Sequence, residues 1–280
     1  MNRRNIVITG LGRSGTTLTC HLLNKLPNTI ALSEPISPGK FADHLPDQEA
    51  VCDGVEEFYR RQRRLALKKG VVISKHVGGV VPDNTKGMVG GVRSRIADKG
   101  KISVDKRIEP DFNLAIKDVG MFTALLPTLA KCFPCYTIVR NPLAVWASAR
   151  SIQPGNRGKG NNPPAIARYD PDTFGRLQES GDQVERWLTR LHLSFERYLT
   201  VLPEGHVLRY EDLVESGGRS LEVIVPAARE LDEPLQSKNF NPLYNQDEML
   251  RFGERLLESE GAYWNFYTRE SVEELLSRTA

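Results

Sequence analysis

Cysteine is scarce in this chain of 280 residues, with four in all: Cys20, Cys52, Cys132 and Cys135. Four cysteines do not make the disulfide framework of a small secreted domain. Cys132 and Cys135 form a Cys-x-x-Cys pair, but a zinc site needs three or four ligands and no second pair stands nearby at ligand spacing. The pattern therefore predicts four reduced cysteines, mostly packing residues, and no metal site.

Long hydrophobic runs are also missing. No apolar stretch reaches the roughly 18 residues that a membrane span needs. The N-terminus passes from Met1-Asn2-Arg3-Arg4 into Ile6-Val7-Ile8, an apolar segment too short for a secretory signal. We therefore expect a cytoplasmic protein with no transmembrane segment, and with a net charge of only +3 we expect no nucleic-acid partner.

Charge is present in ordinary amount, at 26% of residues, but it is unevenly distributed. Residues 60–107 hold fourteen Lys and Arg against three Asp, a net charge of +11. Residues 210–280 hold seven Lys and Arg against fifteen Asp and Glu, a net charge of −8. Two solvated faces that offset each other would explain this pattern, and so would a basic surface for an anionic ligand.

Short apolar segments alternate with helical patterns along the chain. Strands are predicted at 5–9, 29–32, 71–74, 112–116, 135–139 and 206–209, with a basic helix over 55–69 and a loop over 78–91. This alternation predicts one α/β domain over residues 1–280, a parallel sheet with helices on both faces. Residues 153–182 are rich in Gly, Pro and Asn, and we expect a mobile loop there that acts as a lid.

A glycine-rich turn follows the first predicted strand and opens a helix, with the sequence Gly10-Leu11-Gly12-Arg13-Ser14-Gly15-Thr16-Thr17. Glycines let the backbone turn tightly, and the exposed N–H groups at a helix start bind anions. The pattern fits a nucleotide-binding P-loop except that Thr16 stands where that motif has its lysine. Because this lysine normally reaches the β- and γ-phosphates, its absence argues against an ATPase or a nucleotide kinase.

A second polar segment follows the predicted strand at 135–139. Asn141 is suited to cap a helix, and Pro142 to its first turn. Ser148 then lies two turns along on the face of Asn141, with Arg140 at the helix mouth. A phosphate there would meet a guanidinium, a hydroxyl and a positive helix end. Taken singly, Arg140 could equally form a surface salt bridge and Ser148 could be a packing residue.

Four segments in order resemble the sulfotransferases that use 3′-phosphoadenosine 5′-phosphosulfate. Arg-Ser-Gly-Thr-Thr in a strand–loop–helix is similar to their 5′-phosphosulfate loop, and Arg140 with Ser148 to their 3′-phosphate motif. Ala115-Ile116-Lys117-Asp118 resembles a strand-end Lys-Asp of the Golgi-type and bacterial members, and 208–213 a late segment of many members. The resemblance, over about residues 5–230, implies that the donor binds to Gly12, Arg13, Ser14, Gly15, Thr16, Thr17, Arg140 and Ser148, with Tyr210 as a weaker candidate.

The same resemblance implies the catalytic residues. Protein-tyrosine sulfotransferases and their relatives have a glutamate after the second strand, where this chain has Glu34. A carboxylate there could remove the proton of the attacking acceptor hydroxyl. Cytosolic members use a histidine instead, so His76 is the alternative base. Lys117 would stabilise charge on the leaving bisphosphate, Arg13 could share that task, and no metal is required.

The chain also departs from the family, since no Arg-Lys-Gly stands near the C-terminus as in cytosolic members. The acceptor is expected to carry a hydroxyl, on an anionic glycan, a peptide or a small molecule. The basic insert at 55–110 is expected to lie on the acceptor side, with Arg63 and Arg64 among its exposed charges. A P-loop phosphotransferase, with Asp118 as its only plausible Mg²⁺ ligand, and a non-catalytic nucleotide-binding protein remain open alternatives.

Overall fold

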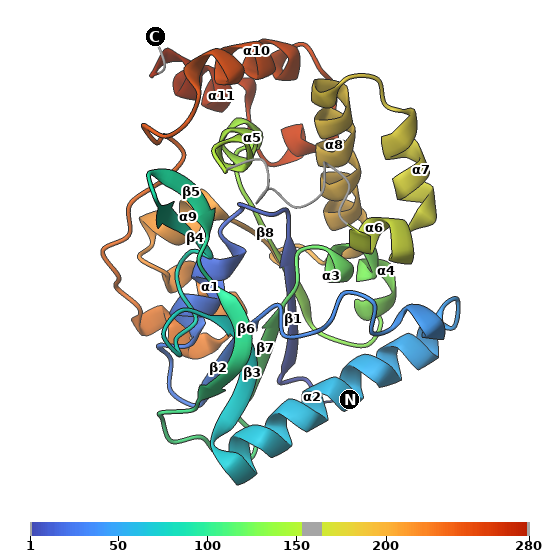
Figure 1. Cartoon of the computed structure of the whole chain (residues 1–280), viewed down its shortest axis with the longest axis vertical. Helices are drawn as coiled ribbons and strands as arrows, with labels where there is room; N and C mark the ends of the chain where they lie inside the picture. Colours follow the sequence, from blue (N-terminus) through green and yellow to red (C-terminus); the bar gives the residue numbers. More distant parts are fainter. Residues whose placement is uncertain (1, 153–163, 279–280) are drawn as a thin grey trace.

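The computed structural model describes residues 2–152 and 164–278. At its centre is a five-stranded parallel sheet with the strand order β2-β7-β1-β8-β9 (Figure 1). Its strands are β1 (Asn5–Gly10), β2 (Thr29–Ser33), β7 (Asn113–Lys117), β8 (Cys135–Val139) and β9 (Val207–Arg209). Each of the five matches a strand predicted from the sequence to within one residue at either end.

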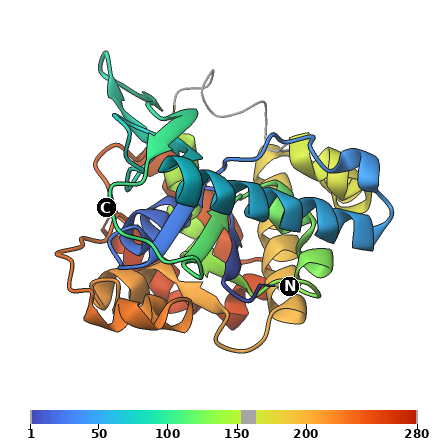
Figure 2. The ribbon, with the colours of Figure 1, turned by 90° about the horizontal axis from the view of Figure 1, so that it is seen from below.

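Helices lie on both faces of this sheet, as the alternating pattern predicts (Figures 1 and 2). None of them, within the described residues, is long and apolar enough to cross a membrane. The α-helices are α1 (Thr16–Leu23), α2 (Gln48–Lys69), α3 (Met121–Ala124), α4 (Leu126–Leu129), α5 (Pro142–Arg150), α6 (Pro164–Tyr169), α7 (Pro171–Glu179), α8 (Gln183–Val201), α9 (Tyr210–Glu215), α10 (Gln246–Leu257) and α11 (Arg269–Ser277). Short 3-10 helices are η1 (Ala42–His44), η3 (Arg219–Val223), η4 (Pro226–Glu230) and η5 (Ala262–Asn265).

The strands of the sheet are apolar because helices cover both of their faces. Every residue of β1, β2 and β8 is buried, which is the pattern of a parallel sheet between helical layers. The register sets Lys117 level with Ile8 of β1 and with Ser33 of β2. The carboxyl ends of these three strands therefore meet at one edge of the sheet.

The basic insert folds into two antiparallel ribbons beside the parallel sheet. One pairs β3 (Val71–His76) with β6 (Asp98–Ser103), and the other pairs β4 (Lys86–Val89) with β5 (Val92–Arg95). The predicted loop at 78–91 is thus wrong in part, because β4 lies within it. Gly90 and Gly91 both have positive φ, at 57° and 80°, and make the two-residue turn of the second ribbon. That ribbon projects from the body of the molecule in Figure 2.

The prediction of a mobile loop at 153–182 can be compared with the structure only in part. Residues 153–163, which include most of the expected lid, lie outside the described residues. The remainder is not loop, since it contains α6 and α7. Asp170 begins α7 because its side chain accepts a hydrogen bond from the Thr173 backbone N–H, a capping contact that composition alone does not reveal.

The expectation of four reduced cysteines is wrong for two of them. Cys52 on α2 and Cys132 after α4 form a disulfide across 80 residues of sequence, whereas Cys20 and Cys135 are free and buried. The pairing depends on the packing of α2 against α4, which spacing along the chain does not show. Disulfides are typical of oxidising compartments, so the cysteines no longer support the expectation of a cytoplasmic protein.

Arg63 also differs from its expected role as an exposed charge for the acceptor. Its side chain is buried and donates to Asn5 Oδ1 at 2.8 Å, to the Phe112 carbonyl at 2.8 Å and to the Arg4 carbonyl at 3.1 Å. The guanidinium also stacks on the Phe112 ring at 4.5 Å. Arg63 therefore joins α2 to the starts of β1 and β7, at the edge of the sheet opposite to Lys117.

These contacts make a stability prediction with a matched control. Arg63→Met should lower the free energy of unfolding by about 2–4 kcal/mol, because it leaves buried oxygens without donors. Arg64→Met, one position along, should change it by less than about 1 kcal/mol, because Arg64 is exposed and pairs only with Glu57. Urea denaturation of both variants measures the difference, and equal effects would contradict the structural role of Arg63.

Candidate functional site

The turn between β1 and α1 has the backbone that its glycines predict. Gly10, Arg13 and Gly15 have positive φ, at 145°, 81° and 94°. A Cβ on Gly15 would lie 2.6 Å from the Tyr210 ring, so glycine is required there for close packing as well. Gly15 is the N-cap of α1 and no side chain caps this helix. The first N–H groups of α1 are thus not used by a capping side chain, as an anion-binding turn requires.

A pocket of about 300 Å³ opens beside this turn. Sequence-predicted residues that line it are Arg13, Gly15, Thr16, Thr17, Arg140, Ser148 and Tyr210. Most of these come from the first turn and from the segment after β8, and the parallel order of the sheet makes those two segments neighbours. Further lining residues, which the sequence did not single out, include Asn84, Arg93, Lys238 and Tyr244.

Arg140 lies at the mouth of α5 as expected, and Asn141 caps that helix by accepting from the backbone N–H of Leu143 at 3.1 Å. The Arg140 guanidinium donates to the Arg13 carbonyl at 2.9 Å, to Asn239 Oδ1 at 2.8 Å and to the Lys238 carbonyl. It also lies over the Tyr210 ring at 4.5 Å. At least three of its five N–H groups are therefore used to hold the walls of the pocket.

Arg13 belongs to the same wall. Its Nε donates to Ser148 Oγ at 3.0 Å and its Nη1 to Asn84 Oδ1 at 3.2 Å. Burial, together with the positive charges of Arg93 and Arg140, lowers the pKa of Arg13 to about 9. Three guanidinium groups so close together favour an anion between them.

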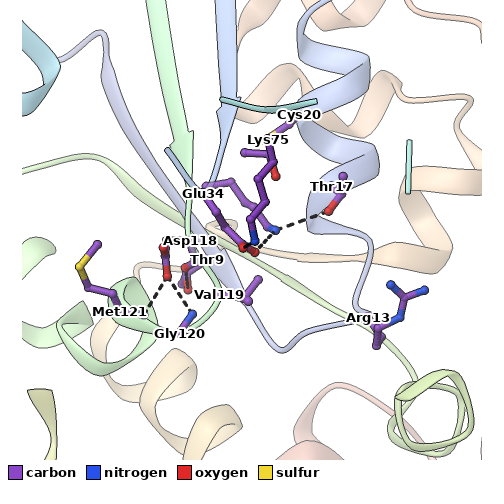
Figure 3. Close-up of polar contacts among 12 residues, drawn as sticks. Thr9, Arg13, Thr17, Cys20, Glu34, Lys75, Asp118, Val119, Gly120 and Met121 are labelled. Atoms are coloured by element: carbon purple, nitrogen blue, oxygen red, sulfur yellow. Dashed lines mark hydrogen bonds and ion pairs between the residues drawn. The ribbon is translucent and has the colours of Figure 1, made fainter. Parts of the chain in front are cut away.

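Glu34 directly follows β2 and contacts Lys117 at the end of β7. Figure 3 shows the side chains of Glu34 and Lys75 together, with Thr17 of α1 nearby. Lys117 Nζ is 2.6 Å from Glu34 Oε1 and 3.4 Å from Thr17 Oγ1, and Lys75 Nζ pairs with Glu34 Oε2. The Glu34 backbone has a positive φ of 45° and its N–H donates to the Lys117 carbonyl at 2.8 Å. Glu34 and Lys117, both predicted as catalytic, are thus in direct contact.

The charge of Glu34 is decided by its two ammonium partners. Burial alone would raise the pKa of this carboxyl, but Lys117 and then Lys75 outweigh it and hold the pKa at about 2. The side chain of Lys117 is only 3% exposed, against 21% for Glu34 and 23% for Lys75. Glu34 is therefore a carboxylate at neutral pH, and Lys75 is the more accessible of its two partners.

The other sequence candidates lie apart from this group. Arg13 points away from Glu34 in Figure 3, toward Ser148. His76 follows Lys75 in β3, so the two side chains point to opposite faces of the ribbon. His76 Nδ1 accepts from the Gly79 backbone N–H at 3.1 Å. The alternative base is thus not placed with the carboxylate and lysines.

The Asp118 side chain caps the start of a helix. Its Oδ1 accepts from the backbone N–H groups of Gly120 at 3.0 Å and Met121 at 2.8 Å, at the start of α3. Burial and the nearby charge of Glu34 raise the pKa of Asp118 to about 6. Within the described residues, no cluster of three or more His, Cys, Asp or Glu side chains is arranged to hold a metal ion.

Lys75 is the residue of this site that sequence reasoning missed. Its strand was predicted to end at residue 74, one position short of it, and its region was assigned to a basic acceptor surface as a whole. Ser33 N–H donates to Ser74 Oγ at 2.9 Å, which attaches β3 to the end of β2 and so sets Lys75 against Glu34. A lysine at the end of a predicted strand was the available signal.

The fold and the site define a P-loop-type α/β protein with a cation-lined pocket beside a carboxylate. No protein-family profile matches the chain, and no curated protein matches it significantly. One similar solved structure is a sulfotransferase from Alicyclobacillus acidocaldarius, with 13% identity, a TM-score of 0.40, and coverage of 98% of this chain and 94% of that chain.

Two further solved structures are similar to the chain. The sulfotransferase domain of an olefin synthase from Synechococcus PCC 7002 has 13% identity and a TM-score of 0.34, covering 98% of this chain and 94% of that chain. Retinol dehydratase, solved with androsterone and the inactive cofactor PAP, has 15% identity and a TM-score of 0.30, covering 100% and 80%. At such TM-scores a likeness does not establish a function, which has to follow from the residues of this chain.

The Glu34 ion pairs make a prediction about acid stability. Because the pKa of Glu34 is held near 2, below its ordinary value of 4.5, the stability it contributes is fully present above about pH 5 and is lost as the pH falls toward 2. At neutral pH this contribution is on the order of 3 kcal/mol. Urea denaturation of wild type and Glu34→Gln between pH 2 and 6 should show a difference that shrinks with acid, while a constant difference would contradict the ion pairs.

Proposed function

We propose that this chain is a sulfotransferase that transfers the sulfuryl group of 3′-phosphoadenosine 5′-phosphosulfate to an acceptor hydroxyl. The observation that best supports this is the position of the Glu34–Lys117 pair. Lys117 Nζ lies 3.4 Å from the hydroxyl of Thr17, which lines the pocket. A carboxylate and an ammonium therefore stand next to the place where the anion-binding turn would hold the reacting end of the donor.

The donor has several negative charges, and the pocket has matching groups for them. The N–H groups at the start of α1, with Thr16 and Thr17, would hold the 5′-phosphosulfate. Arg140 and Ser148 at α5 would hold the 3′-phosphate. Ser14 Oγ in the turn is buried with no hydrogen-bond partner among the described residues, and Ser14 does not line the pocket. Tyr210 supports both segments by packing against Gly15 and under Arg140.

The proposed chemistry is an in-line displacement at sulfur. Glu34 accepts the acceptor hydroxyl proton as the oxygen forms a bond to sulfur, and the bond from sulfur to the bridging oxygen breaks. Lys117 stabilises the negative charge that develops on that oxygen, with Arg13 as a second cation on the donor side. The transferred group is less charged than a phosphoryl group, so the step requires no metal ion.

The two alternatives are less well supported by the geometry. For a phosphotransferase, Thr16 stands in place of the P-loop lysine, and one oxygen of Asp118, the candidate Mg²⁺ ligand, is used to cap α3. For a non-catalytic binder, a carboxylate buried between two lysines beside the pocket has no evident use. Each alternative predicts ligand binding or turnover that differs from what a sulfotransferase would show.

Donor binding tests the class of protein. The bisphosphate product, 3′,5′-bisphosphoadenosine, should bind in calorimetry and raise the melting temperature more than ATP–Mg²⁺ does. Arg140→Ala should weaken bisphosphate binding by about 1.5–3 kcal/mol, the contribution of a hydrogen bond to a charged group. Arg150→Ala is the matched control, because Arg150 lies on the same helix but pairs with Glu248, with its Nη2 2.6 Å from Glu248 Oε1. If ATP–Mg²⁺ raised the melting temperature more than the bisphosphate does, the result would contradict the proposed sulfotransferase function.

Turnover tests the base separately. Glu34→Gln should keep bisphosphate binding nearly intact, because Glu34 does not line the pocket, and should lower the turnover number by roughly 10²–10⁴, because the proton acceptor is lost. A screen of hydroxyl acceptors with labelled donor supplies the assay, and His76→Gln is the control. An active Glu34→Gln enzyme would remove Glu34 from the mechanism, and bisphosphate binding without turnover on any acceptor would favour the non-catalytic binder.

A further inference from the structure

Two lysines of the β3–β6 ribbon lie near the segment of Glu34: Lys75 pairs with Glu34 itself, and Lys99 contacts Ser37. Lys75 and Lys99 are directly opposite each other in the antiparallel register, so their side chains leave the same face of the ribbon. Lys99 Nζ is 3.4 Å from Ser37 Oγ, in the segment that follows Glu34. The residues that line the donor pocket, among those described, include neither lysine.

The opposition of these lysines is unfavourable by itself. Like charges directly opposite in a sheet destabilise the pair, and Glu34 contacts Lys75 alone of the two. The acid in β6, Asp98, does not offset this repulsion. Its side chain is 92% exposed, and its Oδ1 lies 3.7 Å from Arg95 Nη2. Asp98 is opposite His76 in the register, so it lies on the other face of the ribbon. An anion between Lys75 and Lys99 would relieve the repulsion.

Glu34 in its present contacts is poorly suited to take a proton. Lys117 and Lys75 each occupy one of its carboxylate oxygens, and Lys86 and Asp118 are the further charged groups within electrostatic reach. On the proposed function, the donor would draw Lys117 toward its bridging oxygen. This would free Glu34 Oε1, but the ammonium of Lys75 would still hold Oε2 and keep the carboxylate a weak base, so a second event has to withdraw Lys75.

We propose that Lys75 and Lys99 bind an anionic group of the acceptor, a carboxylate, sulfate or phosphate, and that this binding withdraws the Lys75 ammonium from Glu34, which then acts as the base. This inference rests on the proposed sulfotransferase function and deepens it. Lys75 is then a positioning residue for Glu34 and a binding residue for the acceptor. The acceptor hydroxyl gives its proton to Glu34, its oxygen bonds to sulfur, and the electron pair of the broken sulfur–oxygen bond stays on the bisphosphate.

The arrangement also explains how the donor is protected from water. While no acceptor is present, Lys75 keeps Glu34 a weak base and so slows proton removal from water, whose attack would give sulfate and bisphosphate. Hydrolysis of the donor is therefore an assay that needs no knowledge of the acceptor. It is followed as bisphosphate release from saturating donor, in inorganic phosphate or in chloride of equal ionic strength, so that phosphate serves as the anionic probe.

Lys75→Gln should hydrolyse the donor about tenfold faster than wild type, the effect of removing one charge-assisted hydrogen bond from the base. Phosphate should accelerate hydrolysis by the wild type, less by Lys99→Gln, and not at all by Lys75→Gln. Lys75→Arg should behave as the wild type. Lys101→Gln is the matched control, since Lys101 leaves the same face of β6 but lies opposite Ile73.

A pH profile separates this role from a merely structural one. Removing the Lys75 ammonium should raise the pKa of Glu34, so the acidic limb of the hydrolysis profile should move to higher pH in Lys75→Gln. Hydrolysis by Lys75→Gln that is unchanged or slower, or that phosphate accelerates as in wild type, would overturn the inference. Calorimetry with the bisphosphate tests the proposed function independently. If the wild type does not bind the bisphosphate, the proposed sulfotransferase function is wrong, whatever the Lys75 variants show.

Discussion

The parallel pairing of β7 with β1 and β2 is the constraint on which the site depends. It sets Lys117 level with Ser33, so the residue after β2, Glu34, meets the lysine across the strand ends. The same edge of the sheet holds the turn that opens α1, whose Thr17 lies 3.4 Å from Lys117 Nζ. A change of one residue in this register would separate the carboxylate from the ammonium and both from the pocket.

Around that edge the chain gathers several positively charged side chains. Arg13, Arg93 and Arg140 influence one another through their charges, and the pKa of Lys86 falls to about 8 because it is buried near Arg13, Arg95 and Lys75. Such a cluster is unfavourable in the free protein and favourable once a polyanion occupies it. The electrostatics therefore select an anionic ligand more strongly than the net charge of +3 suggests.

The basic insert divides into parts with different roles. Arg63 is used to join α2 to the sheet, and Arg64 pairs with Glu57 on the surface. The ribbons contribute Arg93 to the donor pocket and Lys75 to the carboxylate. The net charge of the whole segment does not distinguish these roles, because it carries no information on which face of a helix or ribbon is buried.

Much of this protein is determined by local patterns in its sequence. The apolar segments of the sheet, the glycine turn before α1 and the Asn141 cap of α5 depend on neighbouring residues, and they are where the sequence predicts them. The same patterns identify Glu34 and Lys117 as strand-end residues and Arg140 as a residue at a helix start, with Ser148 two turns along that helix. Only the tertiary structure decides that Cys52 bonds to Cys132, that Arg63 is buried and that Lys75 meets Glu34. The disulfide joins residues 80 apart, the Arg63 contacts join residues 49 to 59 apart, and Lys75 and Glu34 are 41 residues apart. These contacts form because distant segments pack together, and patterns among neighbouring residues carry no information on that packing.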